Sequence, residues 1–201
     1  MGFMDAIRSA LGIRAETDAS RKANPDDLFG MSTAYLTMEA ELDFEPVDAA
    51  ALCFSEVDNT DFSDTVSEVE DILRAGEDET GTVFRWREDD YGYHWVVLED
   101  DDPEDLLTSI HFAADTFVER GYGSRLLAAV FGFERDGDRA YWIYSFRRGA
   151  YYPFAPERGH EQNDQLLFKL ESVFDGELEL ESDKKYWYPL WPDHDGGHPW
   201  G

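Results

Sequence analysis

The side chains best suited to metal binding cluster near the C-terminus. His194 and His198 lie close in sequence with Asp193 and Asp195 beside them, a pattern that could hold a metal loosely. A zinc site needs about four ligands in fixed geometry, and the Gly196–Gly197 pair gives this segment no rigid frame. We therefore predict no metal site here, and nothing else in the sequence indicates a cofactor.

Residues that could act as a nucleophile or a base are each explained more simply by structure. Cys53 lies in the apolar run 49–54, as a buried thiol would, and His111 lies among apolar positions of a predicted helix. Asp100–Asp102 is one acidic run among many, and a general acid needs a desolvated pocket to raise its pKa. The chain lacks a nucleophile elbow, a phosphate loop and a Rossmann glycine pattern. The sequence therefore predicts no catalytic residues and a protein that is not an enzyme.

The chain is strongly acidic. Its 201 residues include 45 Asp and Glu against 17 Lys and Arg, which gives a net charge of -28, and hydrophobic residues make up 42%, enough for a core. Self-repulsion of this size would loosen a compact state in dilute buffer, whereas about 1 M salt shortens the Debye length to about 3 Å. The acidity therefore predicts a halophilic protein, from a haloarchaeon. Nucleic acid is excluded as a partner because neutralising phosphates needs a patch of Lys and Arg.

The compartment follows from cysteine usage and hydropathy. A single cysteine, Cys53, cannot form an intrachain disulfide, which fits an intracellular protein. No run approaches about 18 apolar residues, so no transmembrane segment is predicted. Residues 1–13 lack the basic start, long apolar centre and cleavage site of a signal peptide. We expect a cytoplasmic location.

The N-terminal segment predicts a short amphipathic helix over residues 1–13. Phe3, Met4, Ile7 and Leu11 recur at helical spacing with polar residues between them. This helix either packs on the folded body or docks on a partner helix or a membrane. With few basic residues it would bind a membrane only weakly by itself. Residues 14–27 are polar without an apolar period, and they predict a flexible linker.

Residues 28–192 predict one α+β domain with a mainly antiparallel sheet and helices on one face, in the order ββαββαββα. Asp61 is the expected N-cap of the first helix and Gly76 its end, and residues 193–201 are expected to form a disordered tail. The hairpin formed by 126–135 and 139–147 is apolar on both faces, so it should lie near the middle of the sheet. The predicted strands are 32–42, 49–55, 82–88, 93–99, 126–135, 139–147 and a short 177–181, and the predicted helices begin at residues 62, 103 and 163.

Aromatic residues gather in segments along the body, and two interpretations apply to them. They either fill the core, with tyrosine hydroxyls reaching the surface, or form a partner surface, where Tyr and Trp are favoured. A pocket lined by Tyr93, Trp95, Tyr144 and Tyr152 would instead suit a small molecule. With the N-terminal helix included, the candidate partner-binding residues are Phe3, Met4, Ile7, Leu11, Tyr91, Tyr93, Trp95, Tyr151, Tyr152, Phe154, Trp187 and Trp191.

Several sequence strings, taken in order, resemble one family. They are MGFMDAIRSALG, LFGMSTAYLTMEAEL, DDYGYHWVVLEDD, RRGAYYPFAP, NDQLLFKLE and YWYPLWP. Together they resemble PspAB, the PspA-associated protein family, over roughly residues 1–192. The most specific parts are Asp89–Leu98 and Arg147–Pro156, whereas the acidic insertions and the tail HDGGHPWG depart from the pattern.

The resemblance implies an accessory protein of the phage-shock or envelope-stress system that works with the membrane-remodelling protein PspA. It implies no catalytic residues. The expected function is that of a non-enzymatic adaptor that binds a PspA-like protein and associates peripherally with the inner face of the membrane through that partner. The alternatives are a small-molecule-binding protein or an enzyme with an aromatic-lined pocket, and a structural subunit of a homo-oligomer. The sequence does not define the oligomeric state.

Overall fold

A computed structural model describes residues 22–194 and 196–201. The predicted helix over 1–13, which carries Phe3, Met4, Ile7 and Leu11, lies outside the described residues, as do residues 14–21 of the predicted linker.

The last part of the predicted linker belongs to the folded body. It forms a 3-10 helix, η2 (Pro25–Phe29), in which Pro25 is buried. The hydroxyl of Tyr144 donates to the carboxylate of Asp27 at 3.0 Å. The ordered body therefore begins before residue 28.

The main sheet contains six strands in the order β2-β3-β1-β4-β5-β6, and every neighbouring pair is antiparallel. The β4–β5 hairpin lies inside the sheet beside β1, because both of its strands are apolar on both faces. A small second sheet pairs β7 with β8. The strands are β1 (Glu45–Ser55), β2 (Val83–Glu88), β3 (Tyr93–Glu99), β4 (Leu126–Arg135), β5 (Asp138–Ser145), β6 (Ala150–Phe154), β7 (Pro156–Glu157) and β8 (Glu161–Gln162).

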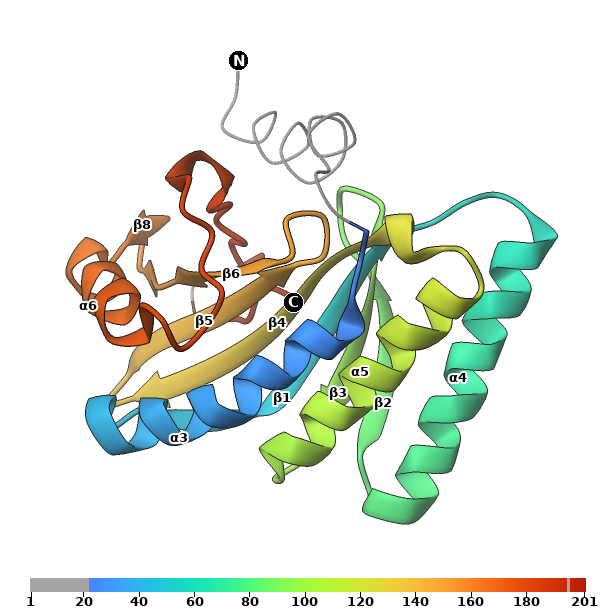
Figure 1. Cartoon of the computed structure of the whole chain (residues 1–201), viewed down its shortest axis with the longest axis horizontal. Coiled ribbons are helices and arrows are strands. Elements are labelled where there is room, and N and C mark those ends of the chain that lie inside the picture. The colour runs from blue at the N-terminus through green and yellow to red at the C-terminus, as the bar shows by residue number, and fades with distance from the viewer. Residues whose placement is uncertain (1–21, 195) are drawn as a thin grey trace.

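Helices cover one face of the main sheet. Figure 1 shows α3, α5 and α4 side by side across the sheet, with α6 beyond the β5 and β6 end. Buried side chains of all of them join one apolar cluster with the facing residues of the strands. The predicted α+β class, with a mainly antiparallel sheet, is confirmed. The helices are α3 (Gly30–Leu42), α4 (Thr60–Thr80), α5 (Pro103–Glu119) and α6 (Asp164–Phe174).

The predicted strand over 32–42 is wrong, because this segment is helix α3. Its buried residues recur at helical spacing, as Met31, Ala34, Tyr35, Met38 and Leu42. The alternation arises because the outward-facing Leu36 and Ala40 fall between the buried Ala34, Met38 and Leu42, and Leu36 is 66% exposed. The order of α-helices and strands is therefore αβαββαβββββα, not ββαββαββα.

Helix α4 also differs from its predicted ends. The side chain of Asn59, not Asp61, caps it by accepting from the backbone N–H of Phe62 at 2.7 Å. The helix continues through Gly76 and ends at Gly81, which has φ 91°. A residue in the left-handed conformation ends the helix, and glycine adopts this conformation without strain. Gly76 keeps helical geometry on a solvent-facing turn, where its cost is about 1 kcal/mol relative to Ala.

The second face of the sheet is covered by the C-terminal segment. Leu190 and Trp200 are buried there, and Trp187, Tyr188 and Trp191 pack around them. The aromatic segment thus folds back on the body, as predicted. The short strand expected over 177–181 reduces to bridging hydrogen bonds with Tyr151, whose backbone N–H donates to the carbonyl of Glu179 at 2.7 Å.

The end of the chain differs from the disordered tail expected over 193–201. Trp200 is only 3% exposed, and its ring contacts Tyr141 edge to face. His198 stacks on Trp200 and shares a 2.7 Å hydrogen bond with the Tyr141 hydroxyl. Burial of Trp200, its ring contact with Tyr141 and the hydrogen bond between Tyr141 and His198 together hold the end of the chain on the body.

Candidate binding site

The structure separates the predicted partner-binding aromatics into two groups. Four of them are buried in the core: Trp95, Tyr151, Tyr152 and Phe154. Of these four, Trp95 also borders the surface hollow described below. The others among the described residues are partly exposed: Tyr91, Tyr93, Trp187 and Trp191. The core interpretation therefore holds for the first group, and the second group remains a candidate partner surface.

The single pocket considered for Tyr93, Trp95, Tyr144 and Tyr152 does not exist. Tyr144 belongs to the cluster beneath the helices, whereas Trp95 and Tyr152 belong to the cluster on the opposite face. The sheet lies between them. Tyr144 and Tyr152 are both buried, so neither opens onto a surface hollow.

The structure does bring the β2–β3 hairpin and the C-terminal segment together around a hollow of about 200 Å3, which we call the aromatic hollow. Its aromatic walls are Tyr91, Tyr93 and Trp95 from the hairpin and Trp191 from the C-terminal segment. Prolines and Leu190 complete the apolar lining, and the carboxyl-bearing residues at it are Asp89, Asp90 and Asp193.

Asp89 organises the hairpin side of the aromatic hollow. One oxygen of its carboxylate accepts from the backbone N–H groups of Tyr91 and Tyr93, both at 2.9 Å. The other oxygen accepts from the indole Nε1–H of Trp95, also at 2.9 Å. Hydrogen bonds to an ionised acceptor are the stronger kind. Asp89 therefore fixes both the turn and the orientation of the Trp95 ring.

The local sequence explains this arrangement. Gly92 has φ 77°, a left-handed conformation that lets the chain reverse after Asp89. Beyond the turn, Tyr93 and Trp95 are two residues apart in β3, so their side chains point to the same face of the sheet. That face is the one opposite the helices, which is where the C-terminal segment packs.

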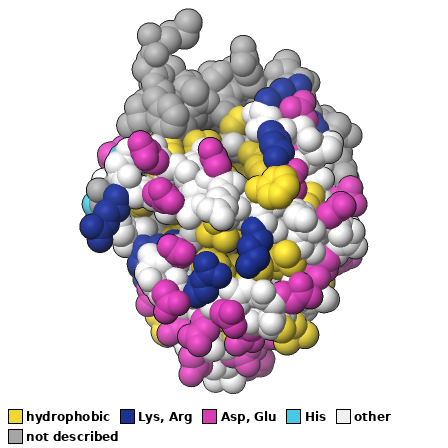
Figure 2. Space-filling view, turned by 90° about the vertical axis from the view of Figure 1, so that its left-hand side faces the viewer, with side chains coloured by type: hydrophobic (Ala, Val, Ile, Leu, Met, Phe, Trp, Pro, Cys, Tyr) yellow, Lys and Arg dark blue, Asp and Glu magenta, His cyan; other side chains and the backbone are white. Residues whose placement is uncertain are grey.

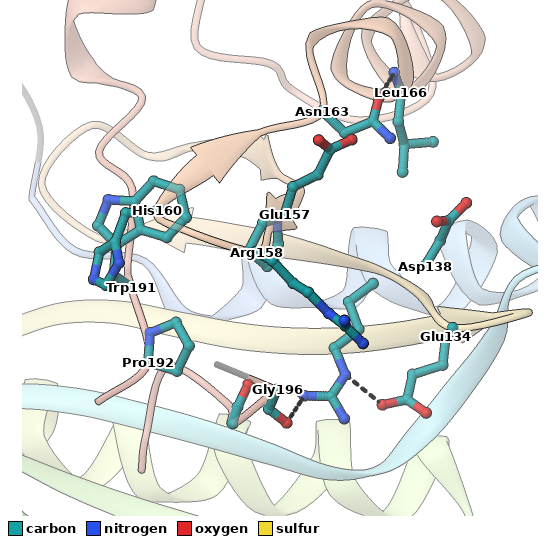
Figure 3. A pocket seen from close by; sticks show the side chains of 14 residues that line it. Glu134, Asp138, Glu157, Arg158, His160, Asn163, Leu166, Trp191, Pro192 and Gly196 are labelled. Atoms are coloured by element: carbon teal, nitrogen blue, oxygen red, sulfur yellow. Dashed lines mark hydrogen bonds and ion pairs between the residues drawn. The ribbon is translucent and has the colours of Figure 1, made fainter. Parts of the chain in front are cut away.

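A second, larger hollow of about 530 Å3 adjoins the first, and we call it the charged hollow. His160, Trp191 and Pro192 line both hollows and so form a shared wall. The rings of His160 and Trp191 lie with centroids 5.2 Å apart. Figure 3 shows these rings at one side of the charged hollow, with acidic residues of the β4–β5 hairpin at the other.

The charged hollow holds both signs of charge. Arg139 pairs with Glu134 at 2.8 Å and also donates to the backbone carbonyl of Gly197 at 2.9 Å. Glu157 at the end of β7 and Arg158 in the turn that follows also line this hollow. Sequence reasoning missed these residues, because only the packing of the C-terminal segment brings them together. The one local signal in the sequence is Gly159, since glycine favours turns, and in the structure Gly159 and His160 both have positive φ angles.

Trp187 lies at a different place, beside the 3-10 helix η4 (Lys184–Tyr186). Its indole N–H donates to the carbonyl of Glu181 at 2.8 Å, and the Lys184 ammonium lies 4.8 Å from its ring centroid. Arg148 pairs with the buried Glu181 at 2.6 Å and lies over the Tyr186 ring. These contacts anchor the C-terminal segment to the β5–β6 turn, and they account for Trp187 without a partner.

Charge is dispersed over the side of the molecule that carries α6 and the C-terminal segment. Figure 2 shows Asp and Glu side chains spread over the side that carries α6 and the C-terminal segment, with Lys and Arg between them. Within residues 22–194 and 196–201, no group of three or more His, Cys, Asp or Glu side chains is arranged to hold a metal. Among the same residues, no helix has the length and apolar character that crossing a bilayer requires.

Two buried titratable groups, Cys53 and His198, keep their uncharged forms near neutral pH. Burial raises the pKa of the Cys53 thiol, and the nearby Asp89 charge raises it further. Burial lowers the pKa of His198 to about 4, with a smaller contribution from Arg139. The Cys53 thiol is therefore unreactive and the His198 imidazole uncharged near neutral pH, and neither residue lines either hollow.

These features define an α+β domain with two adjoining surface hollows, one walled by aromatic rings, which is the form of a binding site. The chain belongs to the PspAB family, PspA associated protein B, whose family model matches residues 1–200. The resemblance stated from the sequence strings is thereby confirmed. No curated protein and no solved structure matches the chain.

Proposed function

We propose that this protein is a non-enzymatic adaptor of a PspA-type envelope stress response that acts by binding a PspA-like membrane-remodelling protein. The observation that carries the proposal is the family match over residues 1–200, since the family is described by association with PspA. In this proposal the protein works in the cytoplasm and reaches the inner face of the membrane through its partner.

The aromatic hollow supplies the contact on the folded body. Tyr and Trp are the residue types that contribute most to protein interfaces, because they combine a large apolar ring with a polar group. Tyr91, Tyr93 and Trp191 are partly exposed and line one hollow from two segments. Residues 1–13 are proposed as a second contact, an amphipathic helix that docks in a groove of the partner.

The test is direct binding between the purified full chain and the PspA-like protein of the same organism, measured by calorimetry in multimolar KCl. The double variant Tyr91→Ala/Trp191→Ala should weaken binding about thirtyfold, as loss of about 2 kcal/mol at a hot spot implies. The matched control is Phe112→Ala, which removes an aromatic ring that is 53% exposed on α5, across the sheet from the hollow. This control should bind as the unmodified chain does.

Each result has a definite meaning. If the unmodified chain does not bind the PspA-like protein, the adaptor proposal fails. If binding occurs and the double variant binds equally well, the aromatic hollow is not the contact. A chain that begins at residue 14 then tests the N-terminal helix, because loss of binding in that variant alone would assign the contact to residues 1–13.

The charged hollow favours one second candidate, a small-molecule-binding protein. Its volume of about 530 Å3 falls inside the range of roughly 300–1,000 Å3 that ligand pockets occupy. A thermal-shift screen of metabolites in molar KCl tests this candidate. A compound that raises the melting temperature of the unmodified chain, but not that of Arg158→Ala, would support it.

A further inference from the structure

We propose that the aromatic hollow binds the guanidinium group of an arginine side chain presented by the protein partner. This inference rests on the proposed function in one respect, namely that the ligand belongs to a protein. The recognition itself depends only on residues that line the hollow, which are aromatic rings, prolines and carboxylates.

The charges at the hollow select a cation. Asp89, Asp90 and Asp193 line it, and no Lys or Arg occurs among its described lining residues. Acidic residues are common over this whole chain, so carboxylates alone would indicate nothing. The distinguishing feature is that these described residues include no balancing Lys or Arg, and His160 of the shared wall is the one imidazole among them. The adjoining charged hollow differs, because Arg139 and Arg158 line it together with acidic residues. An anion such as phosphate would be repelled here.

The aromatic walls favour a guanidinium over an ammonium or a metal ion. A cation over the face of Trp or Tyr is attracted by the ring quadrupole, and arginine forms such pairs more often than lysine. The planar, weakly hydrated guanidinium stacks on rings and offers forked donors to carboxylates. In molar salt, where the Debye length is about 3 Å, simple attraction between charges is weak. Short-range contacts then decide the affinity, namely the cation–π contact with the rings and the hydrogen bonds from the guanidinium to the carboxylates.

The size of the hollow fits one side chain. Its volume is about 200 Å3, below the range of roughly 300–1,000 Å3 typical of drug-sized ligands. A single extended side chain can enter such a space while its backbone stays at the rim. The shared wall of His160, Trp191 and Pro192 would then lead neighbouring residues of the partner segment toward the charged hollow.

The walls are held in place before any ligand arrives. The carboxylate of Asp89 holds the Trp95 indole and the backbone of the hairpin turn. On the opposite side, the Trp191 ring contacts the buried Phe154 ring edge to face, with centroids 5.0 Å apart. Binding therefore orders few protein side chains, which lowers its entropic cost.

The probes for the test are N-acetyl-arginine methylamide, the lysine counterpart and the citrulline counterpart, which has the shape of arginine without its charge. The full chain is titrated with each in molar KCl and followed by NMR. We expect saturable shifts of the Trp191 indole and the Tyr93 amide with arginine, weaker shifts with lysine, and binding at least tenfold weaker with citrulline.

Variants locate the site. Trp191→Leu should abolish the saturable shifts, and Asp90→Asn/Asp193→Asn should weaken arginine binding several-fold, whereas Phe112→Ala should leave it unchanged. The Trp95 indole resonance reports the Asp89 contact, so an unchanged position shows that a variant keeps its fold at the hollow.

The outcomes separate this inference from the adaptor proposal. Equal binding of citrulline and arginine, or shifts that lie outside the hollow, overturns the inference even if the PspA-like protein binds. Saturable arginine binding without any binding of the PspA-like protein overturns the adaptor proposal and leaves the arginine site supported. When both bind, arginine methylamide should compete with the PspA-like protein, and failure to compete refutes an arginine contact in that complex.

Discussion

Replacing Asp89 by alanine should destabilise the fold more than the loss of any ordinary surface acid. The substitution removes the acceptor of three hydrogen bonds, two from backbone N–H groups of the turn and one from the Trp95 indole. The backbone groups belong to partly exposed residues, so water can replace their acceptor. Trp95 is only 3% exposed, and its N–H would be left without an acceptor.

The expected loss follows from these contacts. A buried donor left unsatisfied costs about 1–3 kcal/mol, and each rehydrated backbone group loses about 0.5–1 kcal/mol. The sum for Asp89→Ala is therefore about 3 kcal/mol. Asp89→Asn should lose about 2 kcal/mol, because its carbonyl oxygen still accepts from the turn while its NH2 group faces the indole N–H.

The assay is urea unfolding in multimolar KCl, followed by circular dichroism and analysed by linear extrapolation. The control Asp90→Ala removes the same charge at the neighbouring, exposed position, and it should change stability by less than about 0.5 kcal/mol. An Asp89→Ala variant as stable as this control would refute the assignment of Asp89 as the organiser of the hollow.

Further outcomes follow from composition and burial. The melting temperature should fall as KCl is removed, because a net charge of -28 is then unscreened; an unchanged melt in dilute buffer would contradict the halophilic prediction. Cys53, fully buried with a raised pKa, should react with a thiol reagent only after unfolding, as absorbance would show. Trp200→Ala should cost about 3 kcal/mol, the usual loss for a buried large ring, measured by urea unfolding; a loss below about 0.5 kcal/mol would mean that the tail does not pack. His198 has its pKa lowered to about 4, so below about pH 6.5 the unfolded state binds the proton first. The stability contributed by neutral His198 is therefore lost as pH falls from about 6.5 to about 4, and melts of His198→Gln should lack this component.

Local patterns predicted most elements because they are set by nearby residues. Helix α5 was recognisable from Asp102 and Pro103, and the structure shows the Asp102 carboxylate capping the helix at the N–H of Glu104. The pattern of helix α3 predicts a strand, because its exposed apolar residues Leu36 and Ala40 complete an apolar alternation with the buried ones. Single exposed apolar residues are common in folded proteins, so the sequence pattern does not distinguish them from buried ones.

The candidate site was likewise predicted only in part from the sequence. The hairpin segment Asp89–Leu98 was singled out from sequence, and it does form one wall of the aromatic hollow. The sequence could not show that Trp95 turns inward while Tyr91 and Tyr93 remain partly exposed, because burial depends on what covers each strand face. Nor could it place His160 beside Trp191, since those residues are distant in the chain.

By itself the sequence determined the α+β class, the acidity, the family resemblance and the local turns, since each depends on composition or on residues within one or two elements. Only the tertiary structure decided which aromatics fill the core and which line a hollow. The reason is that the C-terminal segment packs against the sheet face opposite the helices. Burial of Leu190 and Trp200 on that face holds Trp191 against the β2–β3 hairpin, and no local pattern encodes that contact.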